Sequence, residues 1–111
     1  MTQSDLADRY FECIRTRDIE GLIALYAEDA SVVLPDGREF EGVAAIRTMQ
    51  QGIFDTTAPI PTAGPRVVGE SAVAVEVQSR LSDGTPRRTA NFFHLNGAGR
   101  IQRLSVYWRG P

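Results

Sequence analysis

The sequence has few of the residues that build metal, redox and disulfide sites. Its 111 residues include one cysteine, Cys13, and one histidine, His94. One cysteine cannot form an internal disulfide, and a structural zinc site needs a cluster of Cys or His ligands, so neither feature is expected. Cys13 falls on the apolar stripe of a predicted helix, and we interpret it as a small buried residue rather than a nucleophile. We predict no metal site and no cofactor.

Excess charge and long apolar segments are also scarce. The chain has 12 basic and 14 acidic residues, so no basic excess indicates nucleic acid as a partner. Arg80, Arg87 and Arg88 form a local basic cluster, which we interpret as a solvated hairpin end. No apolar run is long enough for a transmembrane helix, and the first residues lack the regions of a signal peptide. We therefore predict a cytoplasmic protein with no membrane partner.

What the sequence does contain is typical of one globular domain, residues 1–111. Hydrophobic residues make up 42% of the chain and charged residues 23%. A domain of this size buries only about two thirds of the surface of its unfolded chain. A pocket would remove contacts from a small core, and dimerisation is one way to recover buried area.

The first half of the chain follows the helical period. A helix capped by Ser4 or Asp5 is predicted to fade near 16–18. Asp18 is predicted to cap a short second helix whose apolar face includes Tyr26. A β-prone run follows at 30–34, then a turn at 35–37, a brief return strand at Phe40 and a third helix over 42–54.

The second half changes to the period of a β-strand. Residues 73–78 alternate as in a half-buried strand. Residues 89–95 carry apolar residues on both faces and are predicted to be buried on both sides, with a partner subunit as the simplest cover for the second face, and 101–108 again carry apolar residues on both faces. Residues 57–65 hold three prolines and predict either an irregular connection or an extended edge segment. Because helices come first and an antiparallel sheet follows, the predicted class is α+β.

Three segments resemble one family. Residues 18–30 (DIEGLIALYAEDA), 42–47 (GVAAIR) and 91–101 (NFFHLNGAGRI) are similar to the second helix, third helix and paired C-terminal strands of ketosteroid isomerase-like and SnoaL-like proteins, members of the nuclear transport factor 2-like (NTF2-like) superfamily. The resemblance implies a cone-shaped half-barrel of the cystatin-like kind, in which three N-terminal helices pack in a curved, mainly antiparallel sheet around an apolar cavity. It also implies a homodimer formed through the outer sheet face, where the alternation places His94 and Tyr107.

The resemblance also suggests catalytic positions. In ketosteroid isomerase a tyrosine and a protonated aspartic acid donate hydrogen bonds to the oxyanion while a second aspartate acts as the base. Tyr10 falls at the position of the tyrosine and Asn91, an amide donor, at that of the acid. Leu34 falls at the position of the base and cannot accept a proton. Asp36, two residues later in the turn, is the substitute base that we consider, although turn aspartates usually bond their own backbone.

The remaining predicted site residues form an apolar wall for the ligand. We expect this wall to include Phe93, Trp108, Leu34, Phe54 and Val106. Two functions stay open. The first is a pocket protein for a small apolar, steroid- or polyketide-like molecule, acting as an isomerase, lyase or cyclase with a rearranged site. The second is a non-catalytic dimeric ligand-binding or scaffold domain that has lost its base.

Overall fold

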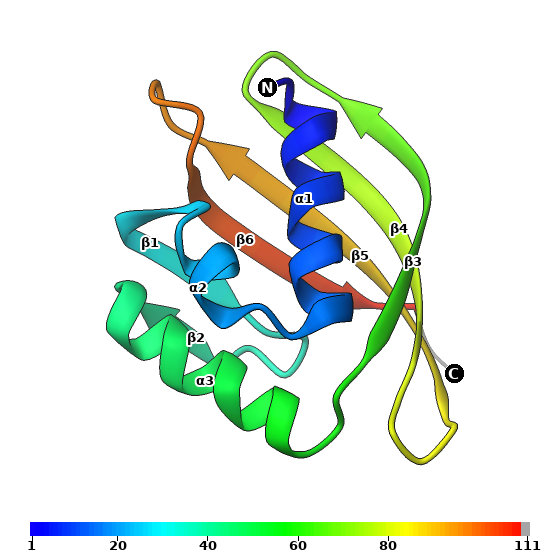
Figure 1. Cartoon of the computed structure of the whole chain (residues 1–111). Helices are drawn as coiled ribbons and strands as arrows, with labels where there is room; N and C mark the ends of the chain where they lie inside the picture. Colours follow the sequence, from blue (N-terminus) through cyan, green and yellow to red (C-terminus); the bar gives the residue numbers. More distant parts are fainter. Residues whose placement is uncertain (110–111) are drawn as a thin grey trace.

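The computed structural model describes residues 1–109, which form three helices and a six-stranded sheet (Figure 1). In chain order the elements are α1 (Gln3–Thr16), α2 (Ile19–Ile23), β1 (Tyr26–Val33), β2 (Glu39–Glu41), α3 (Val43–Asp55), β3 (Ile60–Val68), β4 (Ala72–Arg80), β5 (Pro86–Leu95) and β6 (Ile101–Trp108). The predicted α+β class is confirmed.

The sheet is open and curved, and its strands run in the order β2-β1-β6-β5-β4-β3. Neighbouring strands are antiparallel except for β1 and β6, which are parallel. In Figure 1 the sheet curves around α1, while α2 and α3 lie beside β1 and β2 at one end of the sheet. The candidate site lies between α3, α1 and the concave face of the sheet.

Helix α1 is held at its start by a capping box and along its length by the core. The Thr2 hydroxyl accepts from the backbone N–H of Asp5, and the Asp5 carboxylate accepts from the backbone N–H of Thr2, both at 3.0 Å. The buried face of the helix packs against the concave side of the sheet, where Phe11 and Phe93 meet edge to face with ring centroids 5.9 Å apart. Cys13 is fully buried in this face, as predicted.

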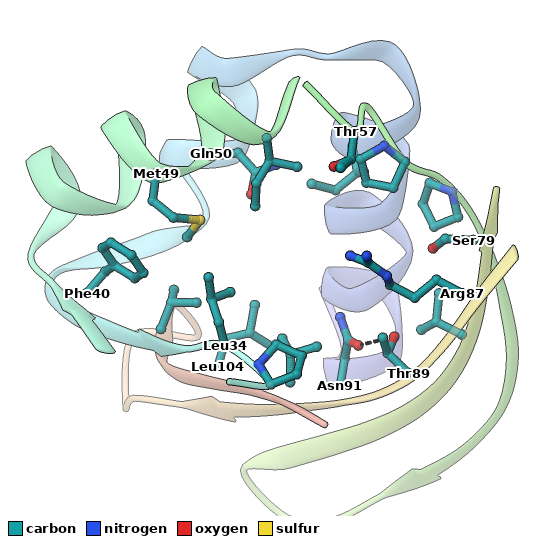
Figure 2. A pocket seen from close by; sticks show the side chains of 18 of the residues that line it. Leu34, Phe40, Met49, Gln50, Thr57, Ser79, Arg87, Thr89, Asn91 and Leu104 are labelled. Carbon is teal, nitrogen blue, oxygen red and sulfur yellow. Dashed lines mark hydrogen bonds between the residues drawn. The ribbon is translucent and has the colours of Figure 1, made fainter. Parts of the chain in front are cut away.

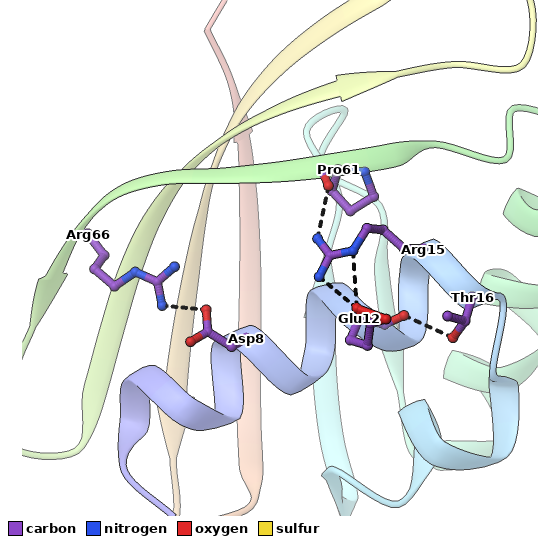
Figure 3. A network of polar contacts seen from close by, with 6 residues as sticks. All are labelled: Asp8, Glu12, Arg15, Thr16, Pro61 and Arg66. Atoms are coloured by element: carbon purple, nitrogen blue, oxygen red, sulfur yellow. Dashed lines mark hydrogen bonds and ion pairs between the residues drawn. The ribbon is translucent and has the colours of Figure 1, made fainter.

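Two arginines connect the edge strand β3 to α1, one by an ion pair and one by a hydrogen bond (Figure 3). Arg66 of β3 reaches Asp8 of α1 at 2.9 Å, and Arg15 of α1 donates to the backbone carbonyl of Pro61 at 3.1 Å. An edge strand has one unpaired side, and its prolines would weaken a central strand. These contacts explain how a proline-containing segment stays in place as one wall of the site.

Two local predictions are refined by the structure. Tyr26 begins β1, not the second helix, because α2 ends at Ile23 and the chain turns at Ala24 and Leu25. The segment with three prolines is extended: it enters β3, which pairs with β4 as the edge of the sheet. Of the two structures predicted for that segment, an irregular connection or an extended edge segment, the edge segment is observed.

Within one chain, β5 is buried on one side only. Its inner residues Asn91 and Phe93 are buried, whereas Phe92 and His94 on the other face are exposed. Phe92 instead packs edge to face on Tyr107 of β6, with ring centroids 5.6 Å apart. Apolar residues on two faces of a strand thus indicated a second apolar surface, but within one chain nothing among the described residues covers it.

Candidate functional site

A cavity of about 560 Å³ opens between α3, α1 and the concave face of the sheet (Figure 2). This volume lies within the range of small-molecule sites, which is roughly 300–1,000 Å³. Most of the wall is apolar, with a few polar side chains directed inward. Its central lining residues are Tyr10, Ile14, Tyr26, Val32, Leu34, Phe40, Met49, Gln50, Ile53, Val77, Arg87, Thr89, Asn91, Leu104 and Val106.

Two tyrosines lie on the cavity wall, one from α1 and one from the start of β1. Burial raises the pKa of both Tyr10 and Tyr26 well above the ordinary value, so both phenols stay protonated. The neighbouring Tyr26 hydroxyl acts against this rise for the pKa of Tyr10. A protonated phenol has one O–H to donate, so the hydroxyl of either tyrosine on the cavity wall can donate to a ligand oxygen. Sequence reasoning singled out Tyr10 and missed Tyr26, because it assigned Tyr26 to a helix.

Asn91 projects into the cavity from β5 (Figure 2). Its side-chain oxygen accepts a hydrogen bond from the Thr89 hydroxyl at 2.9 Å, and the residue is only 6% exposed. The bond fixes which end of the amide is the acceptor, so the NH₂ group is the end left for another partner. Among residues 1–109 that NH₂ group has no hydrogen-bond acceptor. It is a preoriented donor in an apolar setting.

Gln50 supplies a second amide from the opposite wall, on α3 (Figure 2). The residue is 5% exposed, yet its side chain makes no hydrogen bond within the described chain. Within residues 1–109, every side-chain nitrogen or oxygen that is fully enclosed has a hydrogen-bond partner. The Gln50 amide has none, so it must reach the cavity surface. The helical period of α3 placed Gln50 on the same face as Ile46 and Ile53, which was the signal available in the sequence.

Asp36, the predicted substitute base, sits at the mouth of the cavity and is solvated. Its carboxylate accepts from the backbone N–H of Arg38 at 3.0 Å and from the Arg38 guanidinium at 2.7 Å. These contacts lower the pKa of Asp36 below its ordinary value, the backbone hydrogen bond contributing most. A carboxylate in this state binds a proton weakly and is a poor base. No other Asp or Glu of residues 1–109 lines the cavity.

The predicted wall residues divide into two groups. Leu34, Val106 and Trp108 line the cavity, although Trp108 is 61% exposed and lies at its rim. Phe93 and Phe54 are buried in the core behind the lining. The ring of Phe93 is covered by Tyr10, whose ring centroid is 5.0 Å away. Neither phenylalanine lines the cavity, so neither forms part of the wall that the sequence predicted.

Arg87 corrects the interpretation of the basic cluster. Arg80 and Arg88 are exposed, as a solvated hairpin end requires, but Arg87 is half-buried and lines the cavity. The alternation of β5 contained the signal, because Arg87 lies on the same face as Thr89 and Asn91. Its guanidinium carbon is 5.3 Å from the centroid of the Trp108 ring, a cation–π contact at the rim.

His94 lies on the outer face of the sheet, where the alternation placed it. Glu76 is exposed on the outer face and pairs with Arg109 at 3.5 Å, and His94 is also exposed. Within residues 1–109 no group of three or more His, Cys, Asp or Glu side chains could hold a metal ion. None of the helices described is long and apolar enough to span a membrane.

Solved structures from several bacteria share this fold. A protein from Sphaerobacter thermophilus is 25% identical, with a TM-score of 0.87 over 100% of this chain and 99% of that one. A candidate ketosteroid isomerase from Kribbella flavida is 24% identical, with a TM-score of 0.86 over 96% of this chain and 77% of that one. Rv0760c from Mycobacterium tuberculosis, in complex with estradiol-17β-hemisuccinate, is 19% identical, with a TM-score of 0.83 over 96% and 93% of the two chains.

The predicted fold is confirmed by these neighbours and by an NTF2-like protein of the same fold from Cytophaga hutchinsonii. A family model extends the agreement from fold to sequence, since the model of the SnoaL-like domain matches residues 7–104. That match includes the cavity residues from Tyr10 to Leu104. The chain belongs to the SnoaL-like domain family.

Proposed function

We propose that the cavity binds a small, largely apolar molecule of steroid- or polyketide-like shape and holds one of its oxygens by hydrogen bonds. The observation that carries this proposal is an apolar cavity of about 560 Å³ with donors left free inside it. The NH₂ group of Asn91 has no acceptor in the described chain, and Tyr10 adds a protonated hydroxyl to the same cavity. An unpaired polar group in an apolar site favours a ligand that supplies the missing partner.

The proposal describes binding without proton transfer by a carboxylate. Moving a proton beside a carbonyl needs a base within hydrogen-bond reach of the carbon acid. Leu34 lines the wall where the resemblance places that base, and Asp36 is held by Arg38 at the mouth. Both features favour a binding module over an isomerase of the usual kind.

Similar proteins support the class of ligand. The neighbour Rv0760c was solved with a steroid derivative, and another neighbour, from Sinorhizobium meliloti, is a candidate polyketide cyclase. Both names point to fused or extended rings, which suit the aliphatic and aromatic wall of this cavity.

A second candidate function, a cyclase or isomerase with a rearranged site, is favoured by one specific observation. The donors Tyr10, Asn91 and Gln50 converge on one cavity, and such donors stabilise negative charge that develops on a substrate oxygen. A reaction that needs polarisation of a carbonyl more than a strong base would use them. Turnover separates this candidate from simple binding.

We also propose that the outer sheet face forms a homodimer. Phe92 and Tyr107 are 40% and 58% exposed there, side by side, with His94 on the same face of β5. Burying such a pair removes apolar surface from water. Sedimentation of the wild type beside Phe92→Glu tests it: the variant should be a monomer, and an unchanged mass would contradict this interface.

The test of the binding proposal uses the phenolic steroid equilenin. Trp108 is the only tryptophan, so its fluorescence reports on the cavity rim during a titration. We expect saturable quenching, no isomerisation of a β,γ-unsaturated ketosteroid in the same sample, and loss of binding in Val106→Phe, which fills the cavity. The matched variant Tyr107→Ala, on the outer face of the same strand, should bind normally. Turnover would favour the second candidate, and equal affinity in Val106→Phe would contradict the site.

A further inference from the structure

One charged side chain inside the cavity has no role in the function proposed so far. Arg87 projects from β5 toward the middle of the cavity, between Asn91 below it and Gln50 across from it in Figure 2. An apolar ligand held by a phenol and an amide has no need of a guanidinium. Keeping a positive charge half-buried is unfavourable unless an opposite charge compensates for it.

The charges around Arg87 leave it uncompensated within the described chain. The other charged residues of the lining, Asp36 and Arg38, are paired with each other at 2.7 Å. Arg87 forms no ion pair there, whereas the half-buried Arg66 is paired with Asp8. Asp83, in the hairpin turn, accepts hydrogen bonds from Thr85 that lower its pKa, and Arg87 contributes to that shift only slightly, without an ion pair. The cavity therefore carries a net positive charge.

The surroundings of the guanidinium suit a planar anion. Trp108 stacks on Arg87 from the rim, with 5.3 Å between the guanidinium carbon and the ring centroid, which limits the directions in which the side chain can point. Ser79 lies directly across from Arg87 on β4, lines the same wall, and its hydroxyl makes no hydrogen bond within residues 1–109. A guanidinium fork beside a free hydroxyl can donate three hydrogen bonds to one carboxylate.

We propose that Arg87, assisted by Ser79, binds a carboxylate of the ligand, so that the cavity selects an apolar ring system with an acidic tail. This inference rests on the proposed function, since it assigns one end of the same ligand. The tail lies at the rim beside Trp108, and the rings lie between Leu104 and Met49, where the wall is apolar. Arginine is better suited than lysine to this role because its planar fork matches a carboxylate and sheds water more easily.

The test compares two ligands that share one ring system, estradiol and estradiol-17β-hemisuccinate, which ends in a carboxylate. We expect the wild type to prefer the hemisuccinate by at least about tenfold, and the preference to shrink as salt is raised. Arg87→Met should reduce the preference to about one while its affinity for estradiol changes less than about twofold. Arg88→Met, one residue along on the outer face, is the matched control and should keep the preference.

Two further variants separate recognition from folding. Arg87→Lys keeps the charge but not the planar fork, and we expect it to retain part of the preference for the hemisuccinate. Ser79→Ala should lower that preference by a smaller factor than Arg87→Met does. Thermal unfolding of each variant shows whether it folds. Equal affinity of the wild type for both ligands, or an undiminished preference in a folded Arg87→Met protein, would overturn this inference while leaving the proposed binding function intact. If neither ligand binds, the proposed function fails and the inference fails with it.

Discussion

The two faces of β5 differ in which kind of group they leave without a partner. On the inner face, Asn91 is buried and presents a hydrogen-bond donor to the cavity. On the outer face, Phe92 is 40% exposed and presents apolar surface. A polar residue is thus enclosed and an apolar one is exposed, the reverse of the usual alternation. The comparison teaches that each face leaves a group that the described chain does not satisfy, which is the basis for the proposed ligand site on the inner side and the proposed homodimer on the outer side.

The largest expected difference between the two faces is in stability. Phe93 is fully buried against the rings of Tyr10 and Phe11, so Phe93→Ala should lower the free energy of unfolding by about 3–5 kcal/mol. Phe92→Ala, one residue away, should lower it by less than about 1 kcal/mol in the monomer, because its ring is already partly in water. Denaturant unfolding at low protein concentration measures both values. Similar losses in the two variants would contradict the assignment of the faces.

The next effect comes from the two buried phenols of the inner side. Burial raises the pKa of Tyr10 and Tyr26 above the ordinary value of 10.0. The unfolded chain therefore loses these protons first. The contribution of the two tyrosines to the free energy of unfolding is constant below pH 10, and above pH 10 it should fall by about 1.4 kcal/mol per pH unit for each tyrosine.

Urea unfolding at a series of alkaline pH values measures this slope. In Tyr10→Phe the fall in the free energy of unfolding per pH unit should be smaller by the contribution of one tyrosine, about 1.4 kcal/mol. A slope that is the same in the variant would mean that Tyr10 ionises as easily in the folded protein as in the unfolded chain, which would contradict its burial.

A smaller effect is expected on ligand affinity. Asn91→Leu removes the oriented NH₂ donor but keeps the volume, so equilenin should bind about tenfold more weakly, the usual size of one hydrogen bond in an apolar site. His94→Leu changes a polar residue on the outer face of the same strand and serves as control, with unchanged affinity. Unaltered affinity in a folded Asn91→Leu protein would contradict the proposal that Asn91 binds the ligand.

The smallest effect is expected at the mouth of the cavity. Asp36→Asn removes a carboxylate that is already satisfied by Arg38 and by water, so equilenin affinity should change less than about twofold. Any isomerisation activity seen in the wild type and lost in this variant would identify Asp36 as a base and would favour the catalytic candidate.

The sequence predicted the elements of the fold better than the polarity of the cavity. The helical and strand periods identified α1, α3, β4 and the inner face of β5, because each element buries one regular stripe. They failed where the local pattern was ambiguous. Tyr26 continues an apolar helical stripe, yet it pairs with Ile101 of β6 as a strand residue, and that contact is not visible locally.

The candidate site was predicted in part, for a similar reason. The resemblance suggested Tyr10 and Asn91, and both line the cavity. Arg87 was missed because arginines beside a turn are usually solvated, although the alternation of β5 placed it on the inner face with Thr89 and Asn91. Phe93 was placed on the wall because the alternation gives the correct face of a strand but cannot distinguish the lining from the core behind it.

The most direct test of the central claim is an NMR titration that follows side-chain amides during addition of estradiol. Asn91 and Gln50 carry NH₂ groups that reach the cavity, and their resonances can be assigned with the variants Asn91→Leu and Gln50→Leu. The proposed binding site predicts saturable shifts of both NH₂ groups, with the side chains of Gln78 and Gln102 elsewhere on the sheet unaffected. Shifts confined to backbone amides around Phe92 and His94, with both cavity amides unchanged, would place the ligand on the outer face and contradict the account.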